Sequence, residues 1–286
     1  MKYIKYFFQF LLTIISFLIF KILGPTSSSK LSGKIFEIIG PYFRSKKLIY
    51  SNIAKAYPGA DEKELEKITK LMWNNYGRVF SEYMFIKDFR SGKLSDKIEI
   101  VGKEYLDEIK NLNKQVVFIS GHFSNFELMA MYLEKSGIQL SAIYRPLNNI
   151  FLNIIMEKIR NKFICKNQIK KGLGGLKKLI SFINKNYSTA LMIDQRVSQG
   201  IKSEFFGEKA FTTTIPAQLV KKFDIPVVPI FIQRFKGLNF KMKVYDPINF
   251  SKTESIETIT TQLNKKLESM IFKDPYNWIW THNRWK

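Results

Sequence analysis

Short apolar segments alternate with segments of helical periodicity along most of the chain, and this alternation restricts the fold more than any other feature. The strand-like segments lie at residues 115–120, 139–144, 189–193, 227–233 and 240–245. The helical patterns lie at 125–136, 149–163, 175–186, 213–223 and 254–272. The sequence therefore predicts an α/β fold with a central, mostly parallel sheet flanked by helices, in which ligands gather at the carboxyl ends of the strands.

One longer helix is expected ahead of this region, over residues 61–86. Asp61 can cap its first turn, and Glu64 follows three residues later. Apolar residues then recur at spacings of three and four, which predicts a single buried face; they are Leu65, Ile68, Met72, Tyr76, Phe80 and Tyr83.

The N-terminus carries an apolar run at residues 6–20, whose only polar members are Gln9, Thr13 and Ser16. At about 1.5 Å per residue such a helix falls short of a hydrocarbon core of roughly 30 Å, although the apolar residues at 22 and 23 extend it. We expect residues 1–23 to form an uncleaved membrane-anchor helix, spanning or lying in the interface, and residues 24–286 to form one domain that follows the anchor. Flanking lysines favour a cytoplasmic body. A cleaved signal peptide is the alternative, and residues 24–47 read as a linker or a membrane-hugging stretch.

Charge and composition limit the kinds of partner and chemistry. The chain has 46 basic and 24 acidic residues, a net charge of +22, so an anionic partner is expected: nucleic acid, phospholipid headgroups or an acidic carrier protein. Its 45% hydrophobic and 15% aromatic content excludes disorder as the main state. One cysteine, Cys165, excludes an internal disulfide, and two histidines, His122 and His282, exclude a multi-histidine metal site. Neither a metal nor a cofactor is expected.

The most informative stretch runs from residue 116 to 129, VVFISGHFSNFELM. An apolar strand ends at Ser120, Gly121 permits a sharp turn, and His122 stands at the strand's carboxyl end. Glu127 lies five residues on, which in a continuous helix is about 500° around the axis, so the two side chains can meet only if His122 sits in the turn. Glu127 would then orient the imidazole as a general base. Alternatively, Ser124 and Glu127 form a capping box and His122 is an ordinary turn residue.

The segment GHFSNFE resembles the His-x4-Asp/Glu motif of glycerolipid-type acyltransferases, in the form found in the bacterial lipid A biosynthesis acyltransferases. Further elements that resemble this family follow in order along the chain. They are NIAKAYP at 52–58, then Trp73, Asn75, Gly77, Arg78 and Glu82, YRP at 144–146, the pair Asp194 and Gln195, FFG at 205–207, TTTIPA at 212–217, and the ending PYNWIWTHNRWK.

The resemblance implies a membrane-associated acyltransferase of lipopolysaccharide biosynthesis. Such an enzyme moves a fatty acyl chain from an acyl carrier protein thioester to a hydroxyl of a lipid A precursor or related glycolipid. It implies His122 as general base and Glu127 as its orienting carboxylate. It also implies the cell inner membrane as location, with the catalytic domain facing the cytoplasm, an anionic membrane surface as partner, and no nucleic acid.

Candidate substrate-binding residues come from the same motifs. Arg145 follows a predicted strand, and its guanidinium can fork onto the phosphate of a sugar-phosphate acceptor. Asp194 and Gln195 end another strand and are expected to bind sugar hydroxyls or to hold Arg145, and Asn125 is placed with them. Arg196 departs from the family pattern, in which an acidic or small residue often stands at this position.

Other features are expected to be structural. Cys165 lies in a lysine-rich run without a histidine partner, and the glycine-rich segment 171–175 lacks P-loop spacing and is expected to open a helix near Leu176. His282 belongs to the tryptophan-rich ending, which suits either burial or a headgroup-level aromatic belt. Two alternative functions remain open: an acyltransferase acting on another glycolipid or a lysophospholipid, and a non-enzymatic, basic, membrane-anchored protein that binds nucleic acid or anionic lipid.

Overall fold

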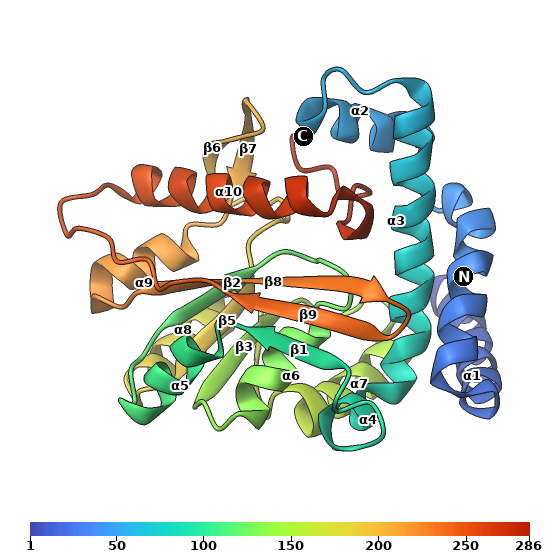
Figure 1. Cartoon of the computed structure of the whole chain (residues 1–286), viewed down its shortest axis with the longest axis horizontal. Coiled ribbons are helices and arrows are strands. Elements are labelled where there is room, and N and C mark those ends of the chain that lie inside the picture. The colour runs from blue at the N-terminus through green and yellow to red at the C-terminus, as the bar shows by residue number, and fades with distance from the viewer.

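A seven-stranded, mostly parallel sheet forms the centre of the molecule (Figure 1). The computed structural model describes residues 1–286, apart from the side chain of Leu173. The strand order is β1-β9-β8-β2-β5-β3-β4, and every neighbouring pair is parallel except β8 and β9. The strands are β1 (Ile98–Val101), β2 (Val117–Ser120), β3 (Leu140–Tyr144), β4 (Asn167–Lys170), β5 (Ser188–Met192), β8 (Val227–Lys236) and β9 (Asn239–Val244). The predicted α/β fold class is confirmed.

The chain also forms ten α-helices, and a small antiparallel hairpin of β6 (Ile201–Phe205) and β7 (Glu208–Thr212) lies apart from the sheet. The helices are α1 (Lys2–Ile39), α2 (Lys46–Ala56), α3 (Glu62–Glu82), α4 (Ile86–Ser91), α5 (Lys103–Asn111), α6 (Glu127–Lys135), α7 (Ile150–Ile159), α8 (Leu173–Ile183), α9 (Ile215–Phe223) and α10 (Ile256–Lys273). Asp61 caps α3 as predicted, since its Oδ1 accepts from the backbone N–H of Glu64 at 2.8 Å.

The two faces of the sheet pack into two separate hydrophobic cores, as the alternation of strand side chains requires. In β2, Val117 and Ile119 belong to the core beneath α8, α9 and α10, whereas Phe118 belongs to the core beneath α4, α5 and α6. Strands covered on both faces read as continuous apolar runs. This explains why the central strands were predictable.

The segment expected to be a linker after residue 23 is helical. Gly24 breaks α1 with φ +75°, and Pro25 begins a second leg that continues to Ile39. This leg packs against α3, which stands at one end of the sheet with α1 outside it (Figure 1). Small residues allow the close approach: a Cβ on Gly77 of α3 would lie 2.1 Å from the backbone oxygen of Ser32. The linker interpretation was wrong because serines and glycines here form a helix-packing face.

The first leg of α1 leaves almost all of its apolar side chains uncovered. Within the described part of the chain, α1 is the one helix long and apolar enough to cross a membrane, and only 6% of its apolar window is buried. Near its start this leg contacts α7, where Phe151 packs against Phe7 and Phe10. The Asn149 side-chain amide, at the start of α7, also donates to the backbone oxygen of Tyr6 at 2.8 Å. Near its end, Phe17 and Phe20 pack against Phe80 of α3. The first leg is therefore held to the body near both of its ends and is exposed along most of its length.

Replacing Gly77 by alanine tests the contact between α1 and α3. Alanine favours a helix over glycine by about 1 kcal/mol, but its methyl group would overlap the Ser32 carbonyl. We expect Gly77→Ala to lower the free energy of unfolding by about 1–3 kcal/mol, measured by denaturant titration in detergent. Gly174→Ala in α8 is the helical control, because a Cβ there meets nothing within 4 Å. Equal stabilities of the two variants would contradict the close packing.

Candidate active site

His122 lies at the carboxyl end of β2, the central strand between β5 and β8. The strand ends at Ser120, whose hydroxyl donates to the backbone oxygen of Ile230 in β8 at 2.7 Å. Gly121 makes the turn possible, since a Cβ there would meet the Phe123 ring at 2.8 Å. The turn before α6 thus presents the imidazole at the edge of the sheet where α/β proteins bind ligands.

The carboxylate that holds this imidazole belongs to Asp194, just after β5. Its Oδ1 lies 2.7 Å from His122 Nδ1, while Oδ2 accepts from the His122 backbone N–H at 2.7 Å and from Trp278 Nε1 at 2.9 Å. The register of the sheet explains the encounter. Ser120, the last residue of β2, pairs with Met192, the last residue of β5. His122 and Asp194, each two residues further along the chain, therefore lie side by side.

Electrostatics fix the roles of the two groups. Burial alone would raise the pKa of Asp194, but the adjacent His122 and the hydrogen bonds from His122 and Trp278 outweigh it and hold the pKa below its ordinary value. The carboxylate is therefore ionised and can only accept hydrogen bonds. In the neutral imidazole the hydrogen must reside on Nδ1, which leaves Nε2 with a free lone pair. The side-chain nitrogen of Gln195 lies 3.5 Å from this Nε2.

Glu127 does not make the hydrogen bond to His122 that the motif spacing predicted. Its Oε1 accepts from Arg160 Nε at 3.0 Å and also pairs with Arg160 Nη2. The capping-box alternative is wrong as well, because α6 has no side-chain cap and the Ser124 hydroxyl accepts the backbone N–H of Arg234 at 2.9 Å. The turn carries Ser124 at φ +45°, so α6 begins at Glu127 and directs this carboxylate toward Arg160 just beyond α7.

His122 opens into a cavity of about 480 Å³ that is lined by both polar and apolar side chains. Its polar and charged lining residues include His122, Glu127, Arg145, Arg160, Gln195 and His282. Its apolar lining residues include Phe126, Met129, Ala130, Ile143, Leu147, Leu191, Met192, Val197 and Ile215. A pocket with apolar walls and a few converging polar groups is the usual form of a small-molecule or acyl-chain site.

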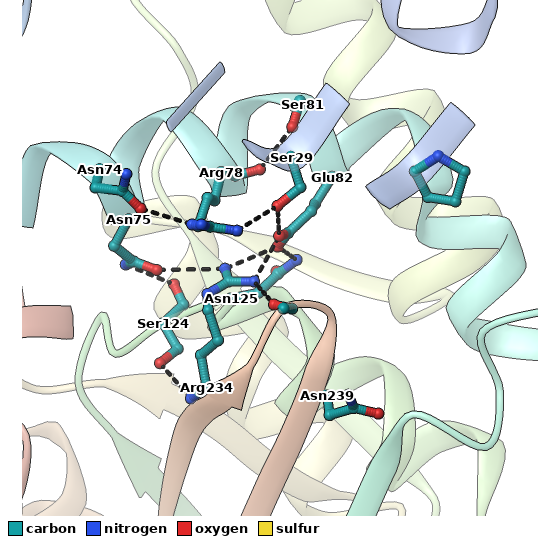
Figure 2. A network of polar contacts seen from close by, with 12 residues as sticks. Ser29, Asn74, Asn75, Arg78, Ser81, Glu82, Ser124, Asn125, Arg234 and Asn239 are labelled. Carbon is teal, nitrogen blue, oxygen red and sulfur yellow. Dashed lines mark hydrogen bonds and ion pairs between the residues drawn. The ribbon is translucent and has the colours of Figure 1, made fainter. Parts of the chain in front are cut away.

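The four predicted substrate-binding residues divide into two groups. Arg145 is exposed and Gln195 half-buried, and both line the cavity. Asp194 is 1% exposed and engaged with His122 and Trp278, so its predicted contact with sugar hydroxyls is not available. Asn125 is also 1% exposed, and its amide donates to Glu82 Oε2 at 3.1 Å within a buried polar network (Figure 2). Asn125 is absent from the cavity lining as far as the described side chains define it.

A second hollow, of about 550 Å³, adjoins the cavity and is strongly basic. The two share Tyr144, Gln168 and Lys171. Four lysines line it: Lys166, Lys170, Lys171 and Lys178. Partial burial and the neighbouring Arg145 lower the pKa of Lys171. Helix α8 begins beside this hollow at Leu173, earlier than predicted. Sequence reasoning missed the hollow because its lysines were indistinguishable from a general lysine excess.

Residues of the C-terminal segment hold the site residues through hydrogen bonds and packing. His282 Nε2 accepts the backbone N–H of Arg196 at 2.8 Å. Trp278 is 2% exposed and Trp280 is 0% exposed. These two tryptophans are therefore core residues and do not form an aromatic belt at the level of the headgroups. Cys165 is buried as well, and burial raises the pKa of its thiol to about 12, which keeps it protonated.

Comparison with known proteins agrees with these observations. The family model for bacterial lipid A biosynthesis acyltransferases matches residues 1–286, the whole chain. The chain belongs to this family. Its relatives include a lipid A biosynthesis acyltransferase of Haemophilus influenzae, 21% identical over 95% of this chain and 84% of the relative. The lipid A biosynthesis lauroyltransferase of Escherichia coli is 23% identical over 85% of this chain and 79% of the relative.

The Escherichia coli lipid A biosynthesis myristoyltransferase is 22% identical over 87% of this chain and 76% of its own length. A crystal structure of the 1-acyl-sn-glycerophosphate acyltransferase of Thermotoga maritima aligns over 93% of this chain and 98% of that one, with a TM-score of 0.44 and 12% identity. Because the family model matches the whole chain, the sequence resemblance to lipid A biosynthesis acyltransferases is confirmed. Family membership identifies the chain as an acyltransferase and implies a lipid A precursor as acceptor.

The environment of His282 predicts a pH dependence of stability in this family member. Burial, aided by Arg284, lowers the pKa of His282 from 6.5 to about 4, although Asp194 acts in the opposite direction. The folded state therefore binds fewer protons than the unfolded chain between these values. His282 contributes stability that is present above pH about 6.5 and is lost as the pH falls toward about 4.

We expect His282→Gln, whose amide oxygen can accept the same N–H without titrating, to show a weaker loss of melting temperature than the wild type between pH 6.5 and 4. Thermal unfolding across this range measures it. Parallel curves for the two proteins would show that His282 is not the group responsible.

Proposed function

We propose that the protein transfers a fatty acyl group from an acyl carrier protein thioester to a hydroxyl of a lipid A precursor, with His122 as general base. The observation that carries the proposal is the His122–Asp194 hydrogen bond, which leaves Nε2 of His122 as the reactive nitrogen of a residue that lines a cavity with polar and apolar walls. Family membership supports the reaction class and the acceptor.

The proposed step conserves protons and electron pairs. His122 Nε2 takes the proton of the acceptor hydroxyl while the oxygen attacks the thioester carbonyl. The tetrahedral intermediate then collapses, the carbon–sulfur bond breaks, and the leaving thiolate takes the proton from the imidazolium. Asp194 stabilises that imidazolium and keeps the ring in the required orientation. No acyl-enzyme is needed.

The Glu127–Arg160 pair forms part of the same cavity wall, and we assign it an electrostatic role. The side chains are 9% and 13% exposed, so the pair is largely desolvated. A guanidinium in such a setting can stabilise the negative charge that develops on the thioester oxygen. Glu127 of the motif then acts through Arg160 instead of through His122.

The positive charge around the site supports anionic substrates. We propose that Arg145 forks onto a phosphate of the acceptor and that Gln195 contacts its hydroxyls. The adjacent four-lysine hollow adds a positive field, which favours approach of a phosphorylated lipid and of an acidic carrier protein. Because these positive charges surround the cavity that His122 lines, they also favour an enzyme over a non-enzymatic nucleic-acid binder.

The position of the cavity relative to α1 supports a membrane location. Leu147 lines the cavity three residues before α7, and α7 contacts the uncovered first leg of α1. We propose that this leg, residues 1–23, anchors the domain of residues 24–286 to the cytoplasmic face of the inner membrane. A lipid acceptor could then reach the cavity without leaving the bilayer surface. Lysophospholipid or another glycolipid acceptor is the alternative to be tested against lipid A precursor.

The general base can be tested with acyl carrier protein loaded with a fatty acid and a lipid A precursor. We expect His122→Gln to lower turnover by about 10²–10⁴-fold and Asp194→Asn to lower it by a comparable factor, because the amide favours the wrong tautomer. Thioester loss with and without acceptor measures the reaction. Near-normal turnover in folded His122→Gln would reassign the base, and acyl transfer to lysophospholipid alone would reassign the acceptor.

Arg145→Lys tests the proposed phosphate contact. The substitution keeps the charge but loses the forked hydrogen bonds. We therefore expect KM for the lipid acceptor to rise about tenfold, corresponding to ~1.4 kcal/mol, while KM for the acyl carrier protein stays within twofold. Initial rates at varied concentrations of each substrate measure both constants. Equal effects on the two substrates would argue against acceptor binding by Arg145.

A further inference from the structure

A buried polar network contacts Ser124 and Asn125, which follow His122 in the same turn (Figure 2). Ser124, two residues after His122, adopts φ +45°, an unusual conformation for a residue other than glycine. Its N–H donates to the Asn277 backbone oxygen at 2.8 Å, its hydroxyl accepts from the Arg234 N–H at 2.9 Å, and its carbonyl accepts from the Asn75 amide at 3.4 Å. Contacts from three separate segments of the chain thus fix the strained residue.

Glu82, at the end of α3, lies at the centre of this network. It is 0% exposed, and its carboxylate accepts hydrogen bonds from three residues. Arg234 Nη1 donates to Oε1 at 2.6 Å and Arg234 Nη2 to Oε2 at 3.0 Å. The Asn125 amide donates to Oε2 at 3.1 Å, and the Ser29 hydroxyl of α1 to Oε1 at 2.8 Å. One carboxylate of α3 thereby links α1, β8 and the turn itself.

Burial of an ion pair is a poor route to stability, because desolvation offsets most of the attraction. The Arg234 and Glu82 side chains are 8% and 0% exposed, so the full desolvation cost applies. What such a pair does provide is direction, since a forked guanidinium–carboxylate contact tolerates one geometry. Here Arg234 contacts Ser124 and Glu82 contacts Asn125, so the pair fixes the position of the two residues that lie two and three places after His122.

We propose that Glu82 and Arg234 are positioning residues for the reaction: their buried ion pair fixes the Gly121–Asn125 turn so that His122 stays aligned with Asp194. Asp194 holds the imidazole from the β5 side, and the Glu82–Arg234 pair holds the backbone of the same turn from the α3 and β8 side. The proposal rests on the function of His122 proposed above.

The network also reaches the apolar N-terminal helix. Ser29 lies five residues after the break at Gly24, donates to Glu82 and accepts from Arg78 Nη1 at 3.2 Å. The second leg of α1 is therefore connected to the catalytic turn through a single carboxylate. The Ser29 hydroxyl contributes one of the hydrogen bonds that orient Glu82. Removing this hydroxyl should therefore have the same kind of effect as breaking the Glu82–Arg234 pair, but a smaller one.

The test compares Arg234→Lys with Arg90→Lys in the full-length protein. Arg90 pairs with Glu134 between α4 and α6, away from the turn, and matches Arg234 in residue type and pairing. We expect Arg234→Lys to lower kcat at least tenfold with KM for both substrates within twofold, and Arg90→Lys to leave both constants near the wild-type values. Ser29→Ala should lower kcat at least twofold and serves as the milder variant if Arg234→Lys does not fold.

Hydrogen exchange followed by mass spectrometry provides a readout that needs no substrate. Peptides covering residues 120–126 should exchange faster in Arg234→Lys and in Ser29→Ala but not in Arg90→Lys. A lowered melting temperature with unchanged kcat and unchanged exchange in this turn would overturn the proposal, as would equal losses of kcat in Arg234→Lys and Arg90→Lys. If the wild type transfers no acyl group, the proposed function fails while the exchange result still decides whether the pair positions the turn.

Discussion

The hydrogen bond between Asp194 and His122 is the interaction on which the site depends. It exists because β2 and β5 are adjacent parallel strands in a register that pairs Ser120 with Met192. The two residues that follow these strand ends are therefore neighbours in space although 72 positions separate them in sequence. Both strands are buried on both faces, so the apolar cores of the domain determine the spacing of the pair.

Two buried carboxylates then act on the same turn from opposite sides. Asp194 accepts the ring and backbone N–H groups of His122, and Glu82 gathers Arg234, Asn125 and Ser29 around the residues that follow. Each carboxylate is satisfied by hydrogen bonds, which makes its burial tolerable. In this protein the common geometry of a parallel sheet edge is thus combined with a buried polar network that extends to the N-terminal helix.

Much of the fold follows from local sequence patterns. The five apolar strands, the Asp61 cap of α3 and the position of His122 just after a strand were all predictable. The short edge strand β4 was not predictable, because it contains the polar residues Asn167 and Gln168 and therefore lacks an apolar pattern. The second leg of α1 was missed because Ser28, Ser29 and Ser32 resemble a linker until their partner α3 is known.

The site residues show where such reasoning stops. The pair Asp194 and Gln195 was placed correctly after a strand, but the role of Asp194 depends on strand order and register, which pairing across the sheet determines. Glu127 was assigned to His122 by proximity in sequence, whereas tertiary packing brings Arg160 to it from beyond α7. The contact between Asn125 and Glu82 was likewise not predictable, since only the fold shows that both residues are buried and hydrogen-bonded to each other.

The most direct test of this account is ¹⁵N NMR of the imidazoles, which is simple here because the chain has only two histidines. In the wild type the neutral His122 should carry its hydrogen on Nδ1, with a downfield proton that reports the bond to Asp194. We expect that signal to be lost in Asp194→Asn and retained in Glu127→Gln, with His282 as internal reference. Retention in Asp194→Asn together with loss in Glu127→Gln would contradict the account.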